Sequence, residues 1–141
     1  MTFIPLSKSN NSVPLFSASV VAGFPSPADD YIEKGLSLDE LLIPHPSSTY
    51  LVRAQGDSMK GCGIFNNDVL IVDRSLTAEH RDIVIAALDG ELTCKFLDVL
   101  QQRLVSANPQ FPPISIPESS DFVIEGVVSA SIRFHKPCSL W

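Results

Sequence analysis

Residues 82–97 read DIVIAALDGELTCKFL, two runs of strand-forming residues joined by Asp89 and Gly90. Asp-Gly supplies the positive φ angles of a tight two-residue turn, so this stretch predicts a β-hairpin. Other short apolar runs bounded by Gly, Asp, Asn and Pro predict further strands at 49–54, 68–73, 103–107 and 122–134. The predicted fold class is therefore mainly β.

The length of the chain indicates one domain with appendages, because 141 residues can bury one core but are too few for two ordinary domains. Residues 49–141 form the predicted β-rich domain, with a proline-rich loop over 109–117. Residues 1–25 are rich in Ser, Asn and Pro and predict an extended N-terminal arm. Residues 26–48 then predict short helices and a linker.

Two helix signals lie within residues 26–48. Ser26 followed by Pro27 combines a cap with a first-turn proline, and Gly35 ends the one or two turns that follow. Ser37 with Glu40 three residues later is a capping box ahead of a short apolar run. We therefore expect one or two short helices before the β-rich domain.

Composition and charge argue against several classes of protein. A net charge of -6 and a pI near 4.8 repel phosphate backbones, so we expect no direct nucleic-acid binding. No apolar run approaches the length needed to cross a bilayer, so we expect a soluble protein with no membrane association. Cys62, Cys94 and Cys138 make neither a disulfide framework nor a CxxC motif, which favours reduced thiols in the cytoplasm. We expect no cofactor and no metal ion.

Ser58 and Lys95 are the candidates for chemistry. Ser58 lies in GDSM (56–59), at a strand-to-turn junction where a substrate backbone can approach, although an ordinary turn serine has the same pattern. A nucleophilic serine needs a base, and Lys95 lies in a strand among apolar residues, although a lysine that snorkels to a solvated face fits equally. Both interpretations remain open from these residues alone. The chain has three histidines, His45, His80 and His135, and their sequence contexts favour loop or surface positions rather than membership of a catalytic triad.

Four segments, taken in order, resemble the LexA/UmuD family of self-cleaving proteins. They are residues 56–59 (GDSM), 68–73 (DVLIVD), the hairpin 82–95 and 126–128 (GVV). The resemblance runs from about residue 20 to residue 128. Residues 24–28 (FPSPA) favour the UmuD branch, whose members are small accessory proteins of an error-prone DNA polymerase. The resemblance implies a LexA/signal-peptidase-like β-rich catalytic domain.

By the same resemblance, Ser58 is the nucleophile, Lys95 is the general base, and the bond between Ala22 and Gly23 is cut. The small side chains suit this role, because Ala22 fits a compact pocket and Gly23 passes the nucleophile without a Cβ clash. Backbone N–H groups of Ser58 and Asp57 are the expected oxyanion donors.

The resemblance also implies partners. We expect a homodimer, a RecA filament on single-stranded DNA as the activator of cleavage, and a UmuC-type translesion polymerase that the shortened chain assists in the SOS response to DNA damage.

Three other functions share parts of this pattern. A self-cleaving transcriptional repressor needs a DNA-reading domain, which residues 1–25, interrupted by Pro5 and Pro14 and with one lysine and no arginine, cannot build. A membrane signal peptidase uses the same Ser/Lys chemistry, but we expect no anchor. The third alternative is a non-enzymatic β-rich binding module, in which Ser58 and Lys95 are unrelated surface residues. In that case the purified chain would never shorten.

Overall fold

The computed structural model describes residues 3–4, 11–16 and 32–140. Within this part of the chain every strand pairing is antiparallel, and strands dominate over helices. The predicted fold class, mainly β, is confirmed. The chain divides into two compact units, a small one within residues 7–44 and a large one that contains residues 45–141 and the first strand.

The small unit contains a two-stranded sheet and a short helix. Strand β2 (Ser12–Phe16) pairs with β3 (Ile32–Ser37), and helix α1 (Leu38–Leu42) follows directly. Ser37 caps α1, since its hydroxyl accepts a hydrogen bond from the Glu40 N–H at 3.4 Å, so the Ser37 half of the predicted capping box is confirmed. Among the described residues, no helix has the length and apolar character needed to span a membrane.

The helix predicted to begin at Ser26 and end at Gly35 is wrong over its second half. The part from residue 32 to Gly35 belongs to strand β3, where Gly35 pairs with Pro14 and Leu36 with Val13; residues 26–31 lie outside the described residues. A helix of one or two turns makes few backbone hydrogen bonds, so pairing with another strand can outweigh local cap signals.

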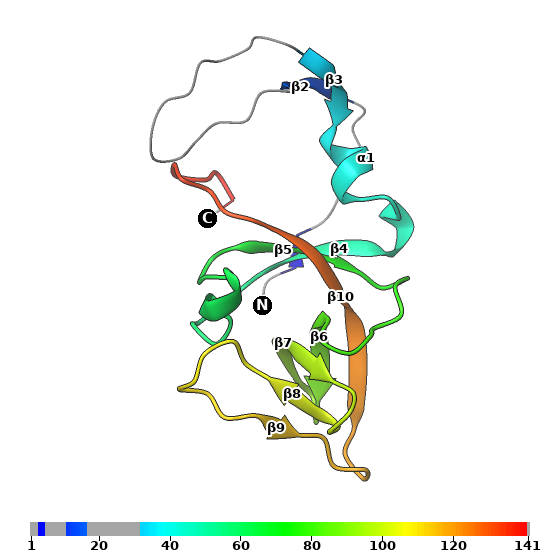
Figure 1. Cartoon of the computed structure of the whole chain (residues 1–141), viewed down its shortest axis with the longest axis vertical. Helices are drawn as coiled ribbons and strands as arrows, with labels where there is room; N and C mark the ends of the chain where they lie inside the picture. The colour runs from blue at the N-terminus through cyan, green and yellow to red at the C-terminus, as the bar shows by residue number, and fades with distance from the viewer. Residues whose placement is uncertain (1–2, 5–10, 17–31, 141) are drawn as a thin grey trace. The chain divides into compact units, whose positions relative to one another are not determined.

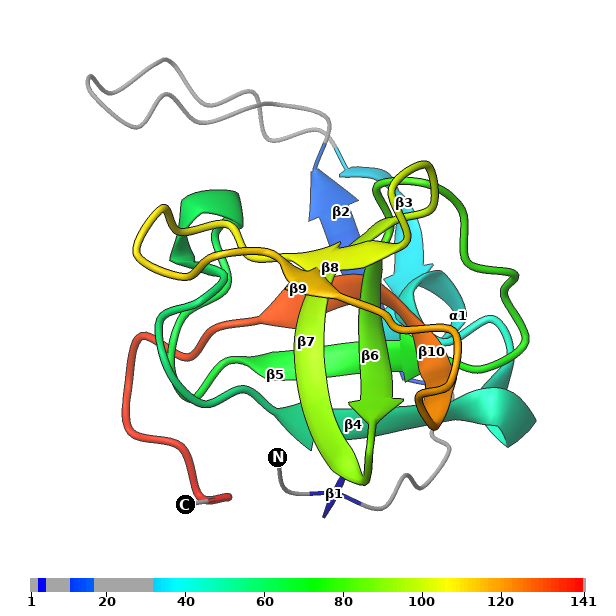
Figure 2. The same cartoon turned by 90° about the horizontal axis from the view of Figure 1, so that it is seen from below.

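The large unit is built around one eight-stranded sheet (Figures 1 and 2), with strand order β1-β4-β5-β10-β6-β7-β8-β9. The strands predicted from the sequence appear close to their expected bounds. The elements are β1 (Phe3–Ile4), η1 (Pro46–Ser48), β4 (Thr49–Arg53), η2 (Lys60–Cys62), β5 (Val69–Asp73), β6 (Ile83–Leu88), β7 (Glu91–Asp98), β8 (Arg103–Val105), β9 (Ile114–Ser115) and β10 (Phe122–Ile132).

The predicted hairpin is present as β6 and β7. Its turn residues Asp89 and Gly90 have φ angles of 50° and 86°, the positive values that an Asp-Gly turn supplies. The predicted loop over 109–117 is only partly a loop, because Ile114 and Ser115 form β9 and pair with Leu104 and Arg103 of β8.

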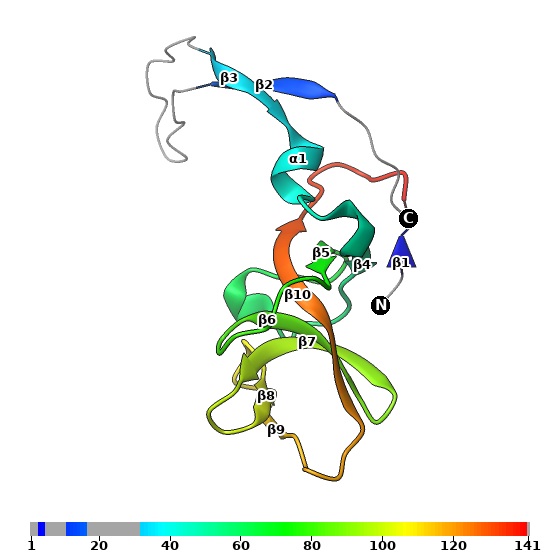
Figure 3. The same ribbon diagram turned by 90° about the vertical axis from the view of Figure 1, so that its right-hand side faces the viewer.

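Strand β10 holds two halves of the sheet together. Its second half pairs with β5 and its first half with β6, and Figures 1 and 3 show it passing along both. The register shifts between Ile124 and Gly126 and again between Val128 and Ala130. Such bulges bend a strand and increase its twist, so β10 can serve both partners.

The core shows that the sheet curls on itself. One buried cluster joins Val52 of β4 and Leu70 of β5 to Ile85 of β6 and Cys94 of β7. Met59 and Ile64, from the loop between β4 and β5, belong to the same cluster. This packing brings the β4–β5 loop against β7, although the two are far apart in the strand order.

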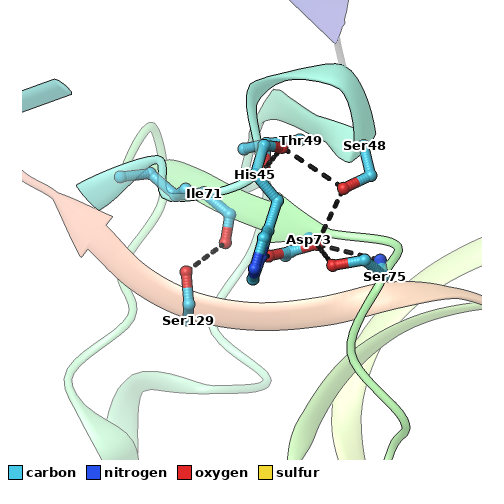
Figure 4. A network of polar contacts seen from close by, with 7 residues as sticks. All are labelled: His45, Ser48, Thr49, Ile71, Asp73, Ser75 and Ser129. Atoms are coloured by element: carbon cyan, nitrogen blue, oxygen red, sulfur yellow. Dashed lines mark hydrogen bonds and ion pairs between the residues drawn. The ribbon is translucent and has the colours of Figure 1, made fainter. Parts of the chain in front are cut away.

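A buried carboxylate fixes the chain where it enters β4 (Figure 4). The Asp73 side chain, 4% exposed, accepts hydrogen bonds from His45 Nδ1 and Ser75 Oγ, both at 2.6 Å, and from Ser48 Oγ at 3.2 Å. Burial acts to raise the pKa of Asp73, but the hydrogen bonds from Ser75 and His45 outweigh burial and lower the pKa to about 2. His45 therefore acts in a structural contact at the end of β5.

The buried cluster should dominate the stability of the large unit. Leu70 is completely buried, so Leu70→Ala should lower the free energy of unfolding by about 3 kcal/mol. Leu100 is 80% exposed, so the matched change Leu100→Ala should alter it by no more than about 0.5 kcal/mol. Urea denaturation followed by far-UV circular dichroism measures both. Equal losses in the two variants would contradict the core assigned here.

Candidate functional site

Ser58 lies in the loop that leaves β4. The strand pairing ends at Ala54, whose N–H donates to the Asp68 carbonyl at 2.8 Å. Gly56 then turns with a φ of 87°, and its N–H donates to Asn66 Oδ1 at 2.9 Å. Ser58 follows just before helix η2, half-buried, at the strand-to-turn junction that the sequence predicted.

Lys95 comes from the neighbouring part of the curled sheet. It lies in β7 opposite Val84 of β6, and only 8% of its surface is exposed. Lys95 Nζ donates a hydrogen bond to Ser58 Oγ at 3.0 Å. The structure thus brings together the two side chains that the sequence selected, and Lys95 is buried rather than snorkelling to solvent.

Two further groups orient the amine. Lys95 Nζ donates to Thr93 Oγ1 at 2.9 Å and to the Cys94 carbonyl oxygen at 3.1 Å. A neutral amine has two N–H groups and one lone pair. When Thr93 and Cys94 accept the two N–H groups, the lone pair is left for the hydroxyl proton of Ser58. The sequence analysis gave Thr93 no role. Its position two residues before Lys95, on the same face of the strand, could have indicated that it contacts the amine.

The surroundings favour the neutral form of Lys95. Burial lowers the pKa of Lys95 below its ordinary value, while a charged Cys94 thiolate would act the other way. Burial raises the pKa of Cys94 to about 12, so this thiol stays neutral near pH 7. None of the ion pairs formed by the described residues includes Lys95, so no carboxylate of this part of the chain opposes the effect of burial.

Two backbone N–H groups beside the nucleophile have no acceptor among the residues that the structure describes. Ser58 offers its carbonyl oxygen to the Ala107 N–H at 2.8 Å, and the Gly61 N–H donates to the Ala107 carbonyl at 2.8 Å. Figure 2 shows the segment after β8 running beside η2. Within the described part of the chain, the N–H groups of Asp57 and Ser58 donate to no acceptor. They remain available to a bound substrate, as expected for oxyanion donors.

A second set of contacts holds the far end of the same loop. Asp68, 2% exposed, accepts hydrogen bonds from Arg133 Nη2 at 2.7 Å, from Arg133 Nε at 3.0 Å and from the Phe65 N–H at 2.8 Å. Burial raises the pKa of Asp68, but the hydrogen bonds from Arg133 and Phe65 outweigh burial and lower it. The guanidinium of Arg133 also lies 4.2 Å from the Phe65 ring centroid. The loop is therefore tied to the end of β10.

Two hollows meet at the Ser58–Lys95 pair. One, of about 170 Å³, is lined by both residues and by Ala54, Met59, Ile64, Leu92 and Cys94 among others. The other, of about 330 Å³, is lined by both residues together with Ser106, Phe111, Pro112 and Ile114 among others. A peptide can therefore place side chains in two hollows that both border the hydroxyl.

The remaining candidates have these positions. Ala22 and Gly23 lie outside the described residues. His80 Nδ1 accepts a hydrogen bond from the Val99 N–H at 3.2 Å, His45 binds Asp73, and His135 is exposed. None of the three histidines contacts Ser58, whose hydroxyl has Lys95 as its partner. Among the described residues, no three His, Cys, Asp or Glu side chains gather in a way that could hold a metal ion.

A serine hydroxyl in contact with a buried lysine amine, on an antiparallel β fold, is the arrangement expected of a Ser/Lys peptidase site. Comparison with known proteins points to a peptidase family. The chain belongs to the Peptidase S24-like family, whose model matches residues 14–129.

Individual relatives cover most of the chain. It is 43% identical over 131 residues to Protein MucA of Escherichia coli, covering 91% of this chain and 89% of MucA. It is 43% identical over 124 residues to Protein SamA of Salmonella typhimurium, covering 87% of this chain and 86% of SamA. It is also 39% identical over 116 residues to the LexA repressor of Xylella fastidiosa, covering 81% of this chain and 54% of the repressor. The predicted resemblance to the LexA/UmuD family is confirmed.

The state of Lys95 can be measured directly. In Ser58→Ala protein with isotope-labelled lysines, the Lys95 Cε resonance should titrate with a midpoint below the ordinary lysine value of 10.5, because burial disfavours the ammonium. Lys95→Arg identifies the resonance. Since burial and not the Ser58 hydroxyl is the main cause, the lowered midpoint should persist without the hydroxyl. A midpoint at or above 10.5 would contradict this description.

Proposed function

We propose that the chain is a self-cleaving serine peptidase that cuts its own N-terminal arm between Ala22 and Gly23. The observation that carries the proposal is the 3.0 Å contact between Ser58 Oγ and the buried amine of Lys95. Membership of the Peptidase S24-like family supports the serine peptidase class. The choice of bond rests on the sequence resemblance, because residues 22 and 23 lie outside the described part of the chain.

The reaction follows from the contacts at the site. Neutral Lys95 takes the proton of the Ser58 hydroxyl as Oγ attacks the carbonyl carbon of Ala22. Negative charge develops on the Ala22 carbonyl oxygen, where the N–H groups of Asp57 and Ser58 can stabilise it. The Lys95 ammonium then gives its proton to the Gly23 nitrogen as the peptide bond breaks. Water, with Lys95 again as base, hydrolyses the ester between Ala22 and Ser58.

The hydrogen bonds of Lys95 suit both halves of this cycle. As an ammonium it can donate to Thr93, to the Cys94 carbonyl and to the leaving nitrogen. As a neutral amine it keeps the first two contacts and directs its lone pair at Ser58. The lysine thus needs no large movement between its two states.

We propose further that the shortened chain is the active form of an accessory subunit for error-prone translesion synthesis in the SOS response. The proposed partners are a second copy of the chain, a RecA filament on single-stranded DNA that promotes cutting, and a UmuC-type polymerase. Similarity to MucA and SamA over most of the chain supports a role of the UmuD type. A filament that favours a docked arm would raise the rate without changing the chemistry.

The dyad assignment predicts the fate of three variants. Ser58→Ala removes the nucleophile and Lys95→Ala removes the base, so purified protein of either kind should stay full length. Gly23→Glu should also block cutting, because it places a charged side chain at the scissile bond. Intact mass spectrometry after incubation measures the outcome, and the wild type should yield one new end at Gly23. Shortening of a dyad variant at the normal rate, without contaminating protease, would rule out the mechanism.

The pH dependence follows from the state of the base. Because the pKa of Lys95 is lowered, the neutral fraction grows as pH rises through that pKa, so spontaneous cutting should accelerate and then level off. Loss of the full-length band is followed from about pH 6 to pH 11, within the range where the fold persists. The midpoint should match that of the Lys95 titration. A rate that stays constant across this range, with docking of the arm not limiting, would exclude Lys95 as general base.

A further inference from the structure

Asn108 is a buried polar side chain near the nucleophile. It follows β8 and is 5% exposed. Its Nδ2 donates to the Asp57 carbonyl oxygen at 3.0 Å, and its Oδ1 accepts the Gln110 N–H at 3.0 Å. A carbonyl can only accept and an N–H can only donate, so these two partners fix which end of the amide faces Asp57.

The Asp57 carbonyl and the Ser58 N–H belong to one peptide group. The described chain has no cis peptide bond, so in this planar group the carbonyl and the N–H point in opposite directions. Asn108 Nδ2 and the Lys60 N–H, the latter at 3.3 Å, both hold the Asp57 carbonyl. The Ser58 N–H is thereby directed away from them, where it donates to no acceptor in the described chain.

The adjacent peptide is held from the same segment. The Ala107 N–H binds the Ser58 carbonyl, so residues 107 and 108 fix the peptide groups on both sides of the Ser58 Cα. The backbone conformation of the nucleophile is therefore set by a segment that follows β8 and lies outside the loop that carries Ser58.

We propose that Asn108 is a positioning residue for the oxyanion hole, which keeps the Ser58 N–H directed at the oxygen on which charge develops. The inference rests on the proposed self-cleavage. A donor fixed before the reaction stabilises the transition state without reorganising, whereas a freely rotating peptide group loses part of that stabilisation. Asn108 does not touch the reacting atoms and acts through the Asp57–Ser58 peptide.

Two substitutions separate the roles of the Asn108 amide. Asn108→Asp keeps an oxygen for the Gln110 N–H but replaces the donor to Asp57 with an acceptor. Asn108→Ala removes both contacts without adding charge. Gln110→Ala is the matched control, because Gln110 is an exposed amide in the same segment and contributes its backbone N–H to the contact with Asn108.

Cutting rates give the first test. On the high-pH plateau, Asn108→Ala and Asn108→Asp should cut about 10- to 100-fold more slowly than wild type, somewhat less than the loss of a whole oxyanion donor. Asn108→Ala should keep the wild-type pH midpoint, since Lys95 is unchanged, and Gln110→Ala should cut normally. A wild-type rate in both Asn108 variants would overturn the inference while leaving the self-cleavage proposal intact.

A transition-state analogue gives the second test. A synthetic peptide of residues 17–22 with a boronic acid in place of its final carboxylate should form a tetrahedral adduct on Ser58, detected by boron NMR. Asn108→Ala should weaken this adduct about as much as it slows cutting. The control uses the same peptide with a terminal amide and Ser58→Ala protein, where adding Asn108→Ala should leave the affinity unchanged. An equal loss for both peptides would assign Asn108 to the shape of the cleft and overturn the inference. If wild type neither cuts nor binds the boronate, the proposed function fails and this inference fails with it.

Discussion

The site depends on one constraint, the burial of an amine that forms no ion pair with any residue described in the structure. A lysine is normally charged near pH 7, and removing an ammonium from water is costly, so burial in β7 lowers the pKa of Lys95 and moves it toward the neutral base. Thr93 and the Cys94 carbonyl supply the hydrogen bonds that a buried amine requires. The packing of β7 against the loop between β4 and β5 therefore determines how deeply Lys95 is buried, how its amine is oriented and how its pKa is shifted.

That loop is held from three directions rather than by its own hydrogen bonds alone. Met59 and Ile64 anchor it in the buried cluster, Arg133 binds Asp68 at its far end, and the Ala107–Asn108 segment holds the peptides around Ser58. Each anchor comes from a different part of the chain. A serine hydroxyl can be placed against an amine with this accuracy because the backbone is fixed before substrate arrives.

Much of the fold followed from local patterns, whereas the support of the site did not. The Asp89-Gly90 turn, the strands on either side of it and the Ser37 cap each depend on neighbouring residues, so the sequence predicted them. The helix expected to end at Gly35 failed because pairing with β2 was not visible locally, and β9 was missed because two residues give no period. Ser58 and Lys95 were selected by resemblance to a family, since each alone fitted an ordinary surface residue. Asn108 carried no signal, because its partner Asp57 is distant in the sequence.

The position of β10 bears on how the protein tolerates change over evolution. Ser58 extends from the β4–β5 side of β10 and Lys95 from the β6–β7 side, so within the sheet the two reactive groups are joined through this single shared strand. Adding or deleting one residue between the two bulges would shift one half of the sheet against the other and separate the hydroxyl from the amine. Insertions and deletions among functional relatives should therefore occur in the turns. Between the two bulges, β10 should keep a constant number of residues even where its side chains differ.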